Sequence, residues 1–133
     1  MATSTQADVE TQAKLAALAD PTRLAIVDLL RRRDHCVCHL VEVLQLKQSV
    51  ISHHVGILRR ARLVEAYPHA SDRRWLYYRL DRASLRELSA RLGMLLDQTD
   101  YDPVPLPCAA DTGDWKQELV LPNDAPVSDN SQR

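Results

Sequence analysis

The spacing of the apolar residues changes along this chain, and the change constrains the fold more than any other feature. From Asp8 to Arg60 apolar side chains recur every three or four residues, as in amphipathic helices. From Leu63 to Leu80 they alternate with polar side chains, as in half-buried strands. Helical spacing returns from Leu85 to Leu95. The pattern predicts a mainly α protein with a small β-hairpin.

Residues with strong positional preferences indicate where the helices before the hairpin begin. The first helix is expected from about Asp8. Asp20 is a good N-cap and Pro21 suits the first helical position, so a second helix is expected to begin there. A third, short helix is expected after the two cysteines at positions 36 and 38. The turn "QLK" then leads into a fourth helix over residues 48–60.

The hairpin is expected from "LVEAYPH" and "RWLYYRL", which alternate and are joined by "ASDR". Pro68 cannot donate a backbone hydrogen bond, so its strand should lie at an edge of the sheet. The last helix is expected after Asp81, where Ser84 and Glu87 have the spacing of a capping box.

This order of elements is that of a winged helix-turn-helix, in which the fourth helix would read the major groove and the hairpin would be the wing. Short polar side chains and an imidazole on that helix can hydrogen-bond to base edges, and arginines at the wing tip can contact phosphates. The alternative for each arginine is a solvated surface charge. The expected partner is double-stranded operator DNA, contacted by Lys47, Gln48, Ser49, Ser52, His53, Arg73 and Arg74.

The charge distribution favours this partner although the net charge of the chain is −1. Residues 47–96 contain ten Lys or Arg and four acids, whereas residues 97–133 contain eight acids and two bases. A basic middle is the electrostatic pattern expected of a nucleic-acid-binding domain. We expect a flexible stretch at 1–7, a DNA-binding and dimerisation domain at 8–97, and an acidic, Pro-rich, largely disordered tail at 98–133.

Nothing in the sequence indicates a membrane or an enzyme. No apolar run approaches the length of a membrane span, and "MATSTQADVE" lacks the pattern of a secretion signal, so we expect a cytoplasmic protein. A small thiol oxidoreductase is disfavoured because the chain has neither Cys-x-x-Cys nor a βαβ pattern. We expect no small-molecule substrate.

Cys36 and Cys38 are the residues whose chemistry is most specific. In a cytoplasmic protein they indicate metal ligands or reactive thiols rather than a disulfide framework, and thiolates select soft ions. His35 and His39 flank them as rival ligands. Residues i and i+2 of a helix project about 200° apart. The two thiols therefore either lie just before the third helix or require its first turn to unwind.

The segments "LADPTRLAIVDLL", "HCVCHL", "QSVISHHVGILRRARLV" and "RRWLYYRL" together resemble the ArsR/SmtB family of metal-responsive repressors, and "CVCHL" resembles the box of its arsenical- and cadmium-responsive members. The resemblance implies a homodimer through the first and last helices. It also implies an apo protein that represses a resistance operon and leaves DNA when a thiophilic ion binds. The leucine spacing of the last helix suits such a seam; packing within one chain is the alternative. The expected interface residues are Leu15, Leu18, Leu85, Leu88, Leu92 and Leu95.

This sequence departs from the family pattern at the ligands. Val41 stands where arsenical repressors carry a third cysteine, no cysteine precedes Cys36, and the last helix has no histidine. The remaining cysteine, Cys108, follows Leu96 by twelve residues, a reach of about 40 Å. We therefore expect As(III), with Sb(III) as a second inducer, at Cys36, Cys38 and Cys108. The alternatives are a repressor responding to Cd(II), Zn(II) or Pb(II), and a redox switch in which Cys36 and Cys38 oxidise.

Overall fold

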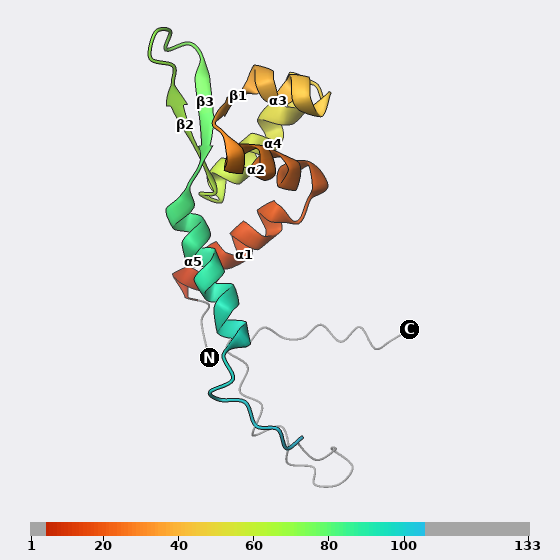
Figure 1. The fold of residues 1–133 in the computed structure, drawn as a ribbon, viewed down its shortest axis with the longest axis vertical. Coiled ribbons are helices and arrows are strands. Elements are labelled where there is room, and N and C mark those ends of the chain that lie inside the picture. Colours follow the sequence, from red (N-terminus) through yellow and green to blue (C-terminus); the bar gives the residue numbers. More distant parts are fainter. Residues whose placement is uncertain (1–4, 106–133) are drawn as a thin grey trace.

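The computed structural model describes residues 5–105, which form helices around one core with a three-stranded antiparallel sheet at one side (Figure 1). The hairpin projects at one end of the molecule, and α1 and α5 lie side by side towards the other. The elements are α1 (Gln6–Leu18), α2 (Pro21–Arg32), β1 (His35–Cys36), α3 (Val37–Leu44), α4 (Gln48–Arg60), β2 (Val64–Pro68), β3 (Leu76–Leu80), α5 (Arg82–Gly93) and a 3₁₀ turn, η1 (Met94–Leu96).

Side-chain caps determine where the first two helices begin. Thr5 and Asp8 form a reciprocal capping box, so α1 begins two residues earlier than expected, inside the stretch predicted to be flexible. The Asp20 side chain accepts a hydrogen bond from the backbone N–H of Arg23, and Pro21 occupies the first position of α2. The predicted start of α2 is confirmed.

The predicted hairpin is confirmed, and a third strand joins it. The strand order is β1-β3-β2, so β2 with Pro68 is an edge strand as expected. The third strand, β1, pairs with β3 through His35 opposite Tyr78 and Cys36 opposite Tyr77. The sequence did not predict β1, because two residues are too few to show a period.

The core lies between α2, α3, α4 and the base of the hairpin. Ile51, Val55 and Leu58 recur at helical spacing along α4, and all three are buried. With them are Ile26, Leu30, Leu40 and Leu63, each at most 1% exposed. Packing on this face leaves the opposite face of α4 in solvent.

The last helix packs on the first. Lys14 of α1 is buried and lies 3.7 Å from Glu87 of α5, and Arg91 of α5 pairs with Asp8. The expected capping box at Ser84 is wrong: Asp81 caps α5 by accepting from the Ser84 backbone N–H, and Ser84 is buried in the first turn.

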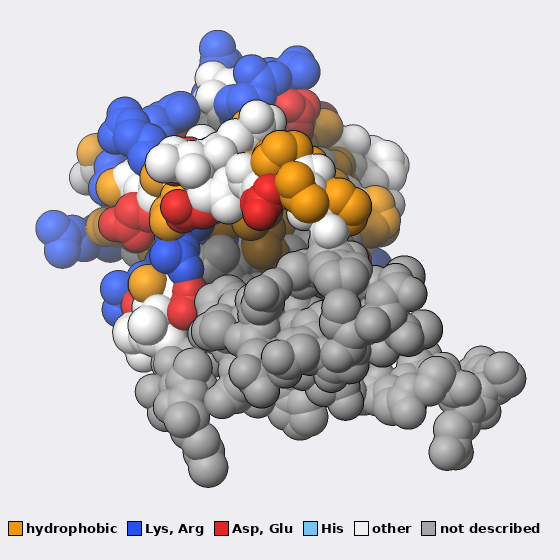
Figure 2. Space-filling model, turned by 90° about the horizontal axis from the view of Figure 1, so that it is seen from below, with side chains coloured by type: hydrophobic (Ala, Val, Ile, Leu, Met, Phe, Trp, Pro, Cys, Tyr) orange, Lys and Arg blue, Asp and Glu red, His pale blue; other side chains and the backbone are white. Residues whose placement is uncertain are grey.

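The leucines expected at a dimer seam separate into two groups. Leu88 is buried, and Leu18 and Leu85 pack against the core of the same chain. Leu15, Leu92 and Leu95 are 40%, 41% and 81% exposed. Seen from below, hydrophobic side chains gather in a patch on the described surface, and most Lys and Arg side chains lie outside this patch, along the margin of that surface (Figure 2).

Among residues 5–105 no helix has the length and hydropathy needed to cross a membrane.

Candidate metal site and nucleic-acid interface

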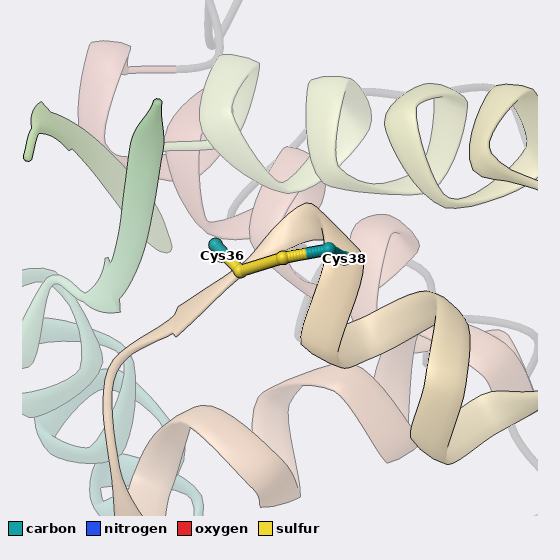
Figure 3. Close-up of a disulfide and its surroundings, with 2 residues drawn as sticks. All are labelled: Cys36 and Cys38. Carbon is teal, nitrogen blue, oxygen red and sulfur yellow. A yellow bond between two sulfur atoms is a disulfide. The ribbon is translucent and has the colours of Figure 1, made fainter. Parts of the chain in front are cut away.

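The cysteine pair lies where the short strand β1 passes into α3. Cys36 is the N-cap residue with extended backbone angles, and Cys38 is in the first turn of the helix. The extended residue turns the Cys36 side chain towards Cys38, so the helix does not have to unwind. The structure joins the two sulfurs in a disulfide (Figure 3). The expectation of free thiols therefore differs from the structure, because this local geometry brings the sulfurs within bonding distance.

His39 joins the thiols, whereas His35 does not. Within residues 5–105, Cys36, Cys38 and His39 form a group whose ligand atoms all lie within 4.8 Å of one another. The His35 ring packs edge-on against His39, with centroids 5.8 Å apart. Its Nδ1 atom is buried without a hydrogen-bond partner in the described part of the chain. Burial and then the neighbouring His39 lower the pKa of His35, which favours a neutral imidazole.

Residues of the wing line a cavity at the thiols. The cavity has a volume of about 420 Å³ and is lined by Cys36, Cys38, His39, His69, Asp72, Trp75 and Tyr77. His69 stacks on Tyr77 with ring centroids 5.4 Å apart, and its Nδ1 atom accepts hydrogen bonds from the backbone N–H groups of Ser71 and Asp72. Sequence reasoning missed the wing residues, because only the β1–β3 pairing brings them to the cysteines.

Two further contacts connect the wing to the segment that carries the thiols. Cys36 pairs directly with Tyr77 of β3. The Tyr67 hydroxyl of β2 donates a hydrogen bond of 2.6 Å to Asp34, which lies just before β1. This hydrogen bond raises the pKa of Tyr67. A displacement of the segment from Asp34 to Cys36 would therefore disturb contacts to both strands of the wing.

The residues expected at DNA on α4 share the exposed face of that helix. Lys47, Gln48, Ser49, Ser52 and His53 are all exposed. His54 faces the opposite way, with its Nδ1 atom 3.1 Å from the Arg23 guanidinium and 4.0 Å from Asp20. Arg23 also donates to the Ala17 carbonyl. These contacts connect α4 to α1 and α2, and they fix the orientation of its exposed face.

The two arginines of the wing tip are both exposed but differ in their surroundings. Arg74 donates to both carboxylate oxygens of Asp72, at 3.0 and 2.8 Å. That contact lowers the pKa of Asp72 and compensates the charge of Arg74. Arg73 is exposed beside it. The remaining residue of the expected set, Cys108, lies outside the described residues.

Comparisons with known proteins agree with this geometry. Residues 20–66 match the family "Bacterial regulatory protein, arsR family". The chain is 44% identical over 50 residues to the transcriptional repressor SmtB homolog of Synechocystis, covering 38% of each protein. It is 39% identical over 69 residues to the arsenical resistance operon repressor of Bacillus subtilis, covering 51% of this chain and 63% of that protein. The chain thus spans less than two thirds of either of these curated relatives.

A solved structure extends the match over most of the described fold. It is a "possible transcriptional regulator for arsenical resistance", 32% identical with a TM-score of 0.56, and the alignment covers 66% of this chain and 90% of that one. The family match includes the α4 face and the cysteine pair. The chain therefore belongs to the arsR family of bacterial regulatory proteins.

Proposed function

We propose that this protein is a cytoplasmic transcriptional repressor that binds operator DNA as a dimer and leaves it when a thiophilic ion binds at Cys36 and Cys38. The observation that carries the proposal is the convergence of these two sulfurs with His39 beside the wing. The exposed face of α4 supports the DNA-binding part. It presents hydrogen-bonding side chains of the kind that read base edges.

The donor set suits soft and borderline ions. We propose As(III), with Sb(III) as a second inducer. As(III) prefers three sulfur ligands: Cys36 and Cys38 provide two of them, and Cys108 is the remaining cysteine of the chain. Several relatives with overlapping sequence are named as arsenic or arsenical resistance regulators. The reduced form of the pair is the one that binds, since each sulfur must be a free thiolate.

The arrangement supplies a physical route from ion to DNA. The wing pairs with Cys36 through Tyr77, and α3 packs against α4. An ion that holds Cys36, Cys38 and a third ligand favours one placement of β1 and the start of α3. DNA favours the placement that leaves α4 and the wing in register with the groove. Two ligands that prefer different arrangements of one element oppose each other's binding.

The test is a titration of the reduced full-length protein on its operator, followed by fluorescence anisotropy. Arsenite should release DNA from the wild type and from the Cys108→Ser variant at different concentrations. It should not release DNA from Cys36→Ser or Cys38→Ser, which should still bind. If arsenite releases DNA from both Cys36→Ser and Cys38→Ser at the concentration that releases the wild type, the proposed site is disproved.

Two alternatives have support of their own. The imidazole of His39 favours Cd(II) or Zn(II), and Pb(II) is the third candidate. The disulfide favours a redox switch, in which peroxide takes two electrons from the thiols and is reduced to water. Release by a divalent ion but not arsenite identifies the first. Release by peroxide without metal, reversed by a thiol reductant, identifies the second.

A further inference from the structure

Another cavity, which shares no residue with the one at the cysteines, lies where α4 ends beside β2. Its volume is about 680 Å³. It is lined by three arginines, by two acids and by small residues of the helix and the strand: Arg59, Arg60, Arg62, Glu65, Asp81 and Gly56 are among them. All three arginines are exposed. The cavity is therefore a basic site separate from the candidate metal site.

The two acids of this cavity already have partners, whereas its three arginines do not have carboxylate partners in the described part of the chain. Glu65 accepts from the Arg79 guanidinium at 3.0 Å, and Asp81 caps α5. Within residues 5–105 none of the ion pairs includes an arginine of this cavity. Because guanidinium groups form strong, charge-assisted hydrogen bonds with carboxylates and phosphates, the cavity favours an occupant with several negative groups.

One of these arginines has a backbone conformation that arginine rarely adopts. Arg62 has a φ of 61°, in the left-handed region. It follows the end of α4, where its backbone N–H donates to the Arg59 carbonyl and the Leu63 N–H donates to the Leu58 carbonyl. Glycine is the usual residue at this place in a helix end, because it has no Cβ. The charge of Arg62 is therefore present at the cavity despite a conformational cost.

The chain leaves this cavity along α5, which extends from the base of the hairpin (Figure 1). The cap of α5, Asp81, lines the cavity, and α5 with η1 is about 24 Å long. Residues 97–105 are all exposed, and the side-chain hydrogen bonds among them reach no further than two residues along the chain. Asp111 and Asp114 follow Leu96 by 15 and 18 residues. An unstructured chain of that length would span roughly 20–25 Å, which matches the way back to the cavity.

We propose that residues 111–118, "DTGDWKQE", dock in this cavity of their own chain and compete there with the phosphates of DNA. The segment lies outside the described residues, and its sequence supplies three carboxylates and Trp115. An indole ring attracts a guanidinium group over its face. The charges are complementary, because residues 97–133 have eight acids and two bases, and residues 47–96 have ten bases and four acids. The competition with DNA rests on the proposed function, whereas the docking does not.

The first test follows Trp115 in the absence of DNA. In the full-length Trp75→Phe protein Trp115 is the remaining tryptophan, and acrylamide quenching of its fluorescence reports its accessibility. We expect the quenching constant to rise about twofold between low salt and about 0.5 M salt, because salt screens ion pairs of exposed groups. The double arginine variant, Arg60→Gln with Arg62→Gln, should show the same rise already at low salt.

The matched control removes the same charge elsewhere. Arg32→Gln with Arg86→Gln replaces two exposed arginines that do not line the cavity. Its quenching constant should stay that of the Trp75→Phe parent. Equal quenching in the two double variants, or a Trp115 that is as accessible in low salt as in high salt, would overturn the docking.

The second test measures the competition on random-sequence DNA. Asp111→Asn with Asp114→Asn, in the otherwise unchanged full chain, should bind DNA about threefold more tightly, because the phosphates no longer have to displace these carboxylates. Asp124→Asn with Asp129→Asn makes the same charge change outside the segment and should gain less. In the double arginine variant the first pair of substitutions should give no gain, since the site for the segment is gone.

The outcomes separate this inference from the proposed function. Equal gains from the two pairs of acid substitutions would assign the effect to net charge and overturn the competition. A Trp115 that is accessible under all conditions, in a protein that binds its operator and releases it with arsenite, would overturn the inference alone. A protected Trp115 in a protein that binds no DNA would support the docking and disprove the proposed function.

Discussion

At the residue scale, the two cysteines of the candidate site are unequal. Cys36 is 5% exposed and forms part of the β1–β3 ladder, whereas Cys38 is exposed on the first turn of α3. In the proposed function Cys36 therefore serves both packing and ligand binding. Cys38 has a role in the proposed site but none in packing, so substitutions at the two positions should separate ligand binding from packing.

Replacing either cysteine with serine should abolish ion response, but the cost to stability should differ. Cys36→Ser places a hydroxyl in a buried position, which costs on the order of 1–3 kcal/mol if it finds no partner. Cys38→Ser should change the free energy of unfolding by less than about 0.5 kcal/mol, as is usual at the surface. Chemical denaturation of both reduced variants measures the difference. Equal losses would contradict the unequal burial.

The Asp20 cap of α2 should make the free energy of unfolding depend on pH in the acid range. The backbone N–H of Arg23 lowers the pKa of Asp20 below its ordinary value of 3.8. Because the folded-state pKa is depressed, the stabilisation is present above the ordinary value and is lost as pH falls through the lower, folded value. Asp20→Asn keeps a capping side chain but cannot ionise. Its free energy of unfolding should fall less steeply than that of the wild type between about pH 5 and about pH 2, and parallel curves would contradict this.

At the element scale, α4 serves two purposes with two faces. Ile51, Val55 and Leu58 anchor it in the core, and His54 connects it to Arg23. The exposed face is thereby held at a fixed angle relative to the wing. If this face reads DNA as we propose, short polar side chains such as that of Ser52 would suffice, because the helix itself places them.

We expect α4 and the wing to contribute differently to DNA binding. The double variant Ser52→Ala, His53→Ala should weaken specific binding more than non-specific binding. Arg73→Ala should weaken both and lower the slope of log K against log salt by about one. Arg74→Ala should change that slope less, because Asp72 already compensates its charge. Operator and random-sequence titrations at several salt concentrations test all three. Full operator affinity in the double variant would mean that another element enters the groove.

At the scale of the whole molecule, α1 and α5 form an arm that extends away from the hairpin (Figure 1). Its contacts within the chain include the pairing of buried Lys14 with Glu87. Leu15 and Leu92 on its outer surface are exposed, and so is Leu95 in the following turn η1. An apolar surface of this kind suits a second copy of the chain, and the half-sites of the operator would then lie about one helical turn, ~34 Å, apart or a multiple of it.

Arginine substitutions should distinguish the dimer seam from the packing of one chain. Leu92→Arg and Leu95→Arg should give folded monomers with weakened DNA binding, because a charge in an apolar interface is costly when unpaired. Leu88→Arg should instead lower the unfolding temperature, since Leu88 is 5% exposed within one chain. Val43→Arg, at another exposed apolar residue on α3, is the control. Sedimentation and thermal unfolding give the result, and dimers in both outer variants would place the interface elsewhere.

The sequence by itself determined the elements that depend on neighbours along the chain. The cap at Asp20, the period of α4 and the alternation of the hairpin are all local, because a helix or a strand pair requires residues a few positions apart. These features were enough to predict the winged arrangement. They also indicated which face of α4 is exposed, since the buried stripe Ile51, Val55 and Leu58 leaves the other face to solvent.

The tertiary structure alone decided what surrounds the thiols and which leucines stay exposed. The pairing of Cys36 with Tyr77 joins residues 41 positions apart, and no periodicity in a two-residue strand reports it. That pairing brings the wing's aromatic side chains to the cysteines. Likewise, the spacing of Leu88 and Leu92 is the same for a dimer seam and for packing on α1. The separation between buried and exposed leucines depends on how α5 lies on α1, which is a property of contacts between distant segments.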